Sequence, residues 1–197
     1  MKKQLILNYP NLILAIINLI AIFFGIFYIR NGFFDYDFFT IIIFVGMAWL
    51  APVADKLLRL KFSALILCFY YIFLILALFF GRILSFYYYF SWYRSFIHFL
   101  GGVFSSLLGI YLIVRLDNIG FLKFSVVMSY ALFFSGFLTS LWTIISGLIS
   151  EFFGTPQLDL NRRIAMGLMG AIFSSILLIL DYLIYHSKYL EKLLRKI

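Results

Sequence analysis

The sequence predicts an all-α, polytopic membrane protein built as a bundle of six transmembrane helices. The chain of 197 residues is 65% apolar, and its mean hydropathy is +1.07. Only 12% of its residues are charged, about half the share that a water-soluble domain usually carries. Six apolar runs are long enough for a helix, rising about 1.5 Å per residue, to cross a hydrocarbon layer about 30 Å thick. Composition therefore excludes a water-soluble enzyme, a disulfide-stapled secreted domain and a disordered tail.

The first three predicted spans are apolar runs without a charged residue. The first contains one amide, Asn18. It is longer than the apolar core of a cleavable signal and no small-x-small cleavage site follows, so we expect it to be retained. The second span is bounded by Asp37 and Asp55, and the third by Lys61 and Arg82. These spans are residues 12–29, 38–54 and 62–81.

The second half of the chain contains three further spans, and two of them carry a titratable group. His98 lies in the fourth span and Asp181 in the sixth, whereas the fifth has no charged residue. Titratable groups are costly to insert into a bilayer, so we expect both to face the interior of the bundle. These spans are residues 95–114, 124–150 and 164–185.

Residues 186–197 form the predicted C-terminal tail. Leu and Ile recur there at helical spacing, opposite Lys and Arg. This pattern predicts a short amphipathic helix on the cytoplasmic surface, attracted to anionic lipid. Because the sequence has no linker rich in Pro, Gly or Ser, residues 1–197 are predicted to form one integral membrane domain.

Basic residues are distributed unevenly between the two sides of the predicted bundle. The segments that include both termini carry 11 Lys and Arg residues, and the alternating segments carry 5. Because positive residues resist translocation, the richer set is predicted to be cytoplasmic. We therefore expect both termini on the cytoplasmic side (N-in/C-in) of the cell membrane, with the lipid bilayer as partner. The net charge of +8 is explained by basic residues between the spans. We therefore expect no nucleic acid as a partner.

Residues 83–93 contain seven aromatic side chains in eleven positions, directly before the fourth span. Tyr and Trp favour the level of the lipid headgroups, because the ring is apolar while its OH or NH needs a polar partner. We expect an outer interfacial segment, folded as a short helix that lies flat. It is either an ordinary aromatic belt or a lip that faces lipid or substrate.

Small and polar residues recur at helical spacing in the last three spans. In lipid, such residues let helix backbones approach closely and find polar partners. We therefore expect these spans to form the packed centre, with the first three spans more peripheral. The residues are His98, Gly102, Ser105 and Gly109, then Gly136, Ser140, Thr143 and Gly147, then Gly167, Ala171, Ser174 and Asp181.

A candidate binding site lies at the outer end of these spans. His98 is one turn inside the outer surface, and the fifth loop returns to the same side. In that loop Pro156 holds Thr155 extended, which aims the following side chains in a reproducible direction. The predicted binding residues are His98, Thr143, Thr155, Gln157 and Asp159, with Asp181 near the inner end.

Three short segments resemble motifs of a known family. They are Phe96-Ile97-His98-Phe99-Leu100-Gly101-Gly102, Gly154-Thr155-Pro156-Gln157-Leu158-Asp159 and Gly170-Ala171. In order and spacing, residues 90–180 resemble the YjdF-like family of uncharacterised bacterial integral membrane proteins. The resemblance implies a membrane-integral fold and carries over His98, Gln157 and Asp159 as site residues. It implies no activity, because the family has no established one.

The chain departs from the family pattern at its carboxylates. Arg94 stands where the pattern has Asp, no acidic pair precedes Trp142, and Arg163 stands where a further Asp is expected. If those carboxylates bind a metal or relay protons in the family, this chain lacks that ability. We expect no metal or other cofactor, since one His and one Asp are fewer ligands than zinc takes from a protein.

Three function classes are compatible with these residues. We favour a non-catalytic binding, assembly or transport-accessory role, with a membrane protein or a second copy as partner, because reactive groups are few. The second class is a small-solute or proton-coupled transporter or channel through spans four to six, between His98 and Asp181. The third is a membrane enzyme in which Asp159 orients His98 as general base and Gln157 stabilises developing charge. A simpler role for His98 is to bond to the fifth loop and pin it.

Overall fold

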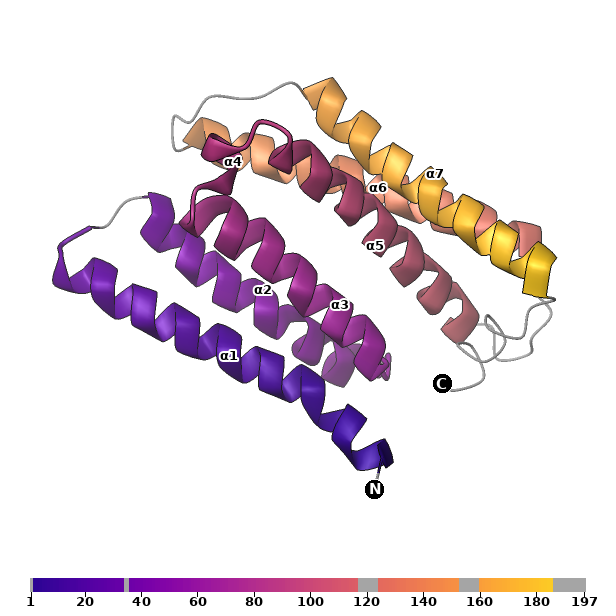
Figure 1. Ribbon diagram of the computed structural model, residues 1–197, viewed down its shortest axis with the longest axis horizontal. Helices are drawn as coiled ribbons and strands as arrows, with labels where there is room; N and C mark the ends of the chain where they lie inside the picture. Colours follow the sequence, from indigo (N-terminus) through magenta and orange to yellow (C-terminus); the bar gives the residue numbers. More distant parts are fainter. Residues whose placement is uncertain (1, 34–35, 117–123, 153–159, 186–197) are drawn as a thin grey trace. The chain divides into compact units, whose positions relative to one another are not determined.

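The computed structural model describes residues 2–33, 36–116, 124–152 and 160–185, and all regular secondary structure in these ranges is helical (Figure 1). The predicted all-α class is therefore confirmed. The elements in chain order are α1 (Lys2–Arg30), α2 (Tyr36–Leu58), α3 (Ala64–Leu74), the π-helix η1 (Ile75–Ile83), α4 (Phe86–Tyr89), α5 (Tyr93–Leu116), α6 (Phe124–Phe152) and α7 (Leu160–Tyr185).

Six helical stretches in the described ranges are long and apolar enough to cross a membrane, and each overlaps one of the six predicted spans. The chain is therefore a multi-pass membrane protein with six helical spans in contact with a lipid bilayer. The stretches are Tyr9–Arg30, Phe38–Leu58, Ala64–Ile83, Tyr93–Val114, Ser125–Ile145 and Asn161–Leu180. The predicted amphipathic tail, residues 186–197, lies outside the described residues.

The helices group into two compact units, Met1–Arg94 and Ser95–Ile197, called here the first and second unit. In the first unit α1, α2 and α3 run in alternating directions (Figure 1). They share a core of large apolar side chains, in which Phe44 and Tyr71 are almost completely buried. The buried members of this core are Ile17, Phe44, Ala48, Tyr71, Leu74 and Leu78.

Two side-chain hydrogen bonds link the helices of the first unit. The indole N–H of Trp49 donates to the Asn18 side-chain oxygen over 3.3 Å, which joins α2 to α1. The Tyr70 hydroxyl donates to the Met47 carbonyl over 2.5 Å, which joins α3 to α2. Water does not compete for such groups inside a bilayer, so each polar side chain is stabilised by a partner within the protein.

The turn between α2 and α3 is tight and strained. Arg59 and Lys61 both have φ of 52°, a left-handed conformation that costs side chains other than glycine about 1–2 kcal/mol. The turn is held because an Asp55 carboxylate oxygen accepts the Phe62 N–H over 2.9 Å. Ser63 then caps α3 by accepting the Ile66 N–H over 3.4 Å.

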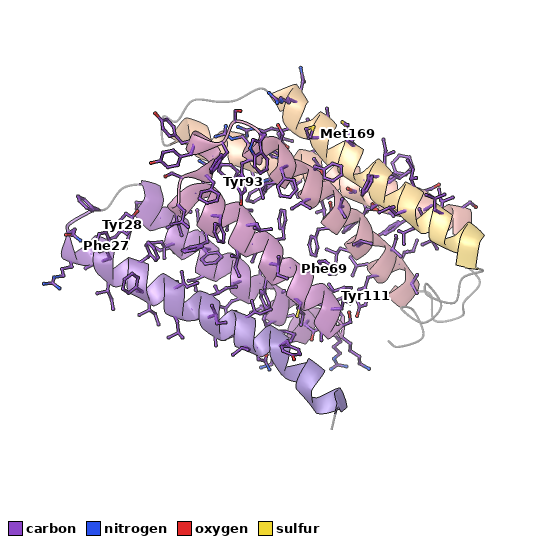
Figure 2. The ribbon with its side chains drawn as sticks, viewed as in Figure 1. Phe27, Tyr28, Phe69, Tyr93, Tyr111 and Met169 are labelled. Atoms are coloured by element: carbon purple, nitrogen blue, oxygen red, sulfur yellow. The ribbon has the colours of Figure 1, made fainter. Side chains whose placement is uncertain are left out.

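The third span changes its hydrogen-bonding pattern half-way, where α3 continues as η1. A π-helix bonds each carbonyl to the amide five residues on, and it occurs mostly as a single turn, frequently at a functional site. The Tyr93 hydroxyl donates to the Leu76 carbonyl of η1 over 2.9 Å. Figure 2 labels this tyrosine at the beginning of α5. The end of the third span is thus fixed to the residues that begin the fourth.

In the second unit α5, α6 and α7 also alternate in direction (Figure 1). They contact one another through small residues: Gly102 of α5 packs on Gly167 of α7, and Gly167 packs on the Thr139 side chain of α6. The predicted small residues of α5 and α7 therefore pack within this unit. On α6 the contact with Gly167 is made by Thr139, which is not among the predicted residues, and Gly147 of the predicted set has no atom within 4 Å of its Cβ position. Farther along the helices an apolar cluster is built from Ile110, Val127 and Ala131, with Ile113, Val114 and Leu178 against it.

Candidate functional site

The structure places three of the predicted site residues on helices. His98 lies on α5 and is half-buried, and Thr143 lies on α6 and is fully buried. The Thr143 hydroxyl donates to the Thr139 carbonyl over 2.7 Å. Asp181 falls within α7. The loop residues Thr155, Gln157 and Asp159 lie outside the described residues.

His98 and Thr143 approach the same end of the second unit. His98 is one turn before Gly102 on α5, and Thr143 is one turn after Thr139 on α6. Gly102 and Thr139 both contact Gly167. Because α5 and α6 run in opposite directions (Figure 1), these two steps lead to the same end of the helices. His98 and Thr143 are thus each about one turn from a shared contact point, and their predicted role as binding residues stays a prediction.

That contact point is a crossing of α5 and α7 at which the two backbones touch. A Cβ atom on Gly102 would overlap the Gly167 carbonyl oxygen, and a Cβ atom on Gly170 would overlap the Phe99 carbonyl oxygen. Ala171 completes the contact, with its amide nitrogen 3.1 Å from the Cβ position of Gly102. Small residues spaced four apart, here Gly167 and Ala171, are the usual basis of such close helix contacts in membranes.

One turn beyond the crossing, five serines from three helices form what we call the serine layer. Ser105 and Ser106 come from α5, Ser135 comes from α6, and Ser174 and Ser175 come from α7. Each is buried. The α5 and α7 pairs both follow the crossing by three or four residues, so they lie at the same level along the bundle.

The serine hydroxyls differ in their hydrogen bonds. The Ser105 and Ser135 oxygens are 3.1 Å apart, and Ser135 donates to the Gly102 carbonyl over 3.0 Å. Ser174 donates to the Ala171 carbonyl in its own helix over 2.9 Å. The hydroxyl oxygens of Ser106 and Ser175 have no hydrogen-bond partner among the described residues. Buried polar groups without a partner are uncommon and costly in proteins.

The serine layer is bounded on both sides along the helices. On one side the backbones of α5 and α7 touch at Gly102 and Gly167. On the other side is the apolar cluster of Ile110, Val127 and Ala131. Ile110 is one turn after Ser106, and Ala131 is one turn before Ser135. The serine layer therefore lies between the backbone contact of α5 with α7 and an apolar cluster.

Comparison of this chain with protein-family models, with curated proteins and with solved structures gives no match. Among the residues that the structure describes, no three His, Cys, Asp or Glu side chains come together as a metal site.

A second polar cluster, in the first unit, is absent from the candidates that the sequence suggests. The guanidinium carbons of Arg82 and Arg94 lie 5.5 Å and 5.3 Å from the centre of the Tyr87 ring. Both distances are within the range of a cation–π interaction. From the sequence alone, these arginines are basic residues between two spans, and Tyr87 is one member of an aromatic segment. One feature of the sequence could have pointed to this cluster: an arginine stands at each end of the aromatic segment, with no acidic residue between them.

Proposed function

We propose that the chain is a non-catalytic membrane protein with a binding or assembly role, and that the second unit is its packed structural part. The supporting observation is the crossing of α5 and α7, where the backbones touch at Gly102 and Gly167. A helix interface closed by backbone contact is suited to holding helices in a fixed arrangement. It is unsuited to a wide polar passage between the same helices.

The resemblance to the YjdF-like family forms part of this proposal. Gly102, Gly170 and Ala171, which carry that resemblance, all take part in the crossing. His98 lies one turn from the crossing on the same face of α5. Close packing of α5 against α7 is therefore a structural role that fits the motif residues on these helices. We also propose that both termini face the cytoplasm and that the membrane is the cell membrane, as the distribution of Lys and Arg predicts.

The assembly role is tested by the mass of the protein in its native state. The chain has a mass of 23.1 kDa. We expect native mass spectrometry of protein extracted from its own membrane in a mild detergent to show a larger complex, with a second copy or another membrane protein. A monomer under several mild detergents, with no bound protein, would contradict the assembly role.

A transporter through α5, α6 and α7 is the second candidate. It is favoured by the buried hydroxyls of Ser106 and Ser175, which have no partner among the described residues and offer hydrogen bonds to a small polar solute. It is disfavoured by the boundaries of the serine layer. The enzyme hypothesis needs His98 together with Asp159 and Gln157, and the last two lie outside the described residues.

Proton flux into proteoliposomes separates the first two candidates. We expect the lumen to acidify no faster than in liposomes without protein, since the serine layer ends at an apolar cluster. Faster acidification that disappears in both His98→Ala and Asp181→Asn, but persists in the control His186→Ala, would establish a transporter in place of the assembly role.

A further inference from the structure

The first unit holds two positive charges against one aromatic ring. The guanidinium carbons of Arg82 and Arg94 lie 5.5 Å and 5.3 Å from the centre of the Tyr87 ring. The ring attracts both cations through the negative charge of its faces. The two like charges repel each other, and an anion bound beside them offsets part of this repulsion.

The backbone around this ring is arranged to bring the three residues together. Ser85 has φ of 59°, which turns the chain back between η1 and α4. Gly81 leaves the space that the ring occupies, because a Cβ atom there would lie 2.6 Å from the Tyr87 ring. Tyr93 contacts the ring with a centroid separation of 5.7 Å and is itself anchored to the Leu76 carbonyl. The cluster is therefore built into the fold rather than formed by chance between long side chains.

This cluster lies at the level of the lipid headgroups. The third span ends at Ile83 and the fourth begins at Tyr93, so the residues between them lie at a membrane surface. Tyr88, Tyr89 and Trp92 are 86%, 70% and 58% exposed there, as is usual for aromatic side chains at an interface. Residues 82–94 carry two arginines and no acidic residue.

Arginine suits a phosphate ligand in particular. Its planar guanidinium presents N–H donors in a fixed fork that fits phosphate oxygens. Lipid phosphates lie at the depth where the third and fourth spans end, and cationic residues near the bilayer surface each contribute about 1 kcal/mol to the binding of anionic lipid. The aromatic side chains beside the cluster can pack against the upper part of the acyl chains.

We propose that Arg82 and Arg94, held at the Tyr87 ring, form a binding site for the phosphate of an anionic lipid headgroup. The site lies in the first unit and does not depend on the role proposed for the second unit.

Native mass spectrometry of the purified full-length chain, stripped of lipid in a neutral detergent, tests this site. The probes are phosphatidylglycerol and phosphatidylcholine with identical acyl chains, which differ in headgroup charge. We expect the wild type to bind phosphatidylglycerol more tightly. Arg82→Gln and Arg94→Gln should each weaken that binding about fivefold, and the double variant about thirtyfold. Arg30→Gln is the matched control for general attraction between charges, because Arg30 is an exposed arginine at the end of the first span, and it should weaken the binding less than either site variant.

Two comparisons keep the proposal falsifiable. Equal affinity of the wild type for the two lipids would overturn it without any variant, so the result does not depend on whether the double variant folds. An unchanged affinity for phosphatidylglycerol in a folded double variant would overturn it as well. Inorganic phosphate distinguishes a lipid ligand from a soluble one. We expect millimolar phosphate to leave the bound phosphatidylglycerol in place. Displacement of this lipid from the wild type would support a phosphate site with a soluble ligand.

Discussion

Five serines at one level of the second unit have different effects on stability, although their side chains are identical. Ser135 links two helices, because its hydroxyl contacts Ser105 and donates to the Gly102 carbonyl. The Ser106 hydroxyl is equally buried but has no partner among the described residues. A hydrogen bond between membrane helices contributes about 0.6 kcal/mol on average, whereas a buried polar group without a partner costs about 1–3 kcal/mol.

Alanine variants of these two serines should therefore have opposite effects. Ser135→Ala is expected to lower the free energy of unfolding by about 1 kcal/mol, because it removes two interactions between α5 and α6. Ser106→Ala should leave it unchanged or raise it by up to about 1 kcal/mol, because it removes a hydroxyl without a partner. Reversible unfolding in mixed detergent micelles measures both. Equal destabilisation by the two variants would show that Ser106 also has a structural bond.

Residues of the candidate sites were predictable only where helical spacing connects them. His98 and Gly102 fall at helical spacing on α5, which is visible in the sequence. Thr139, the α6 residue against Gly167, is not among the small and polar residues that the sequence analysis singles out. Arg82, Tyr87 and Arg94 meet only because the chain turns at Ser85, which has a left-handed conformation that serine seldom adopts. The hydrogen bonds of the individual serines were likewise not predictable, since their sequence positions do not distinguish bonded from unbonded hydroxyls.

At the scale of elements, the crossing of α5 and α7 depends on glycine at Gly102. Gly102→Ala places a methyl group on the Gly167 carbonyl, and such overpacking costs about 1–3 kcal/mol. Gly147→Ala on α6 is the matched control, because no atom lies within 4 Å of its Cβ position. That control should raise stability by up to about 1 kcal/mol through helix propensity. Thermal unfolding in one detergent compares the stability of the two variants. Equal stability of Gly102→Ala and Gly147→Ala would contradict the backbone contact.

The π-helix η1 accepts a side-chain hydrogen bond from outside its own segment. Tyr93→Phe removes the hydroxyl that donates to the Leu76 carbonyl and is expected to lower the free energy of unfolding by about 1 kcal/mol. Tyr88→Phe, which removes a hydroxyl from a highly exposed side chain, should have an effect below about 0.5 kcal/mol. The same unfolding measurement compares them. A loss in Tyr88→Phe as large as in Tyr93→Phe would contradict a specific role for the Tyr93 bond.

The long helices were predictable as elements, whereas η1 was not. Apolar length alone identifies a span, because a bilayer requires about 20 apolar residues in a helix. Residues 64–74 are all apolar, and residues 75–83 are apolar except for Gly81 and Arg82. The first stretch is α-helical and the second is a π-helix. The Tyr93 hydroxyl also donates to the Leu76 carbonyl of η1, and apolar length predicts neither this bond nor the change of helix type.

At the scale of the whole molecule, the six spans and the distribution of basic residues make a prediction about orientation. A fluorescent reporter that matures only in the cytoplasm should be active when it is fused to the C-terminus. A reporter that is active only outside the cytoplasm should be inactive at the same position. The reverse pattern would contradict the cytoplasmic C-terminus that the distribution of basic residues predicts.

The closed serine layer of the second unit is tested most directly by its access to water-soluble reagents. In a Cys68→Ser background, which removes the single native cysteine, one variant carries Ser106→Cys and a control carries Ser91→Cys, an exposed position in the first unit. Charged thiol reagents are applied to open membranes, so that both surfaces are reached. We predict rapid labelling of Ser91→Cys and none of Ser106→Cys, because the layer is bounded by backbone contact and by an apolar cluster. Labelling of Ser106→Cys at a rate similar to that of the control would reveal a water-filled path through α5, α6 and α7 and would contradict a packed structural unit.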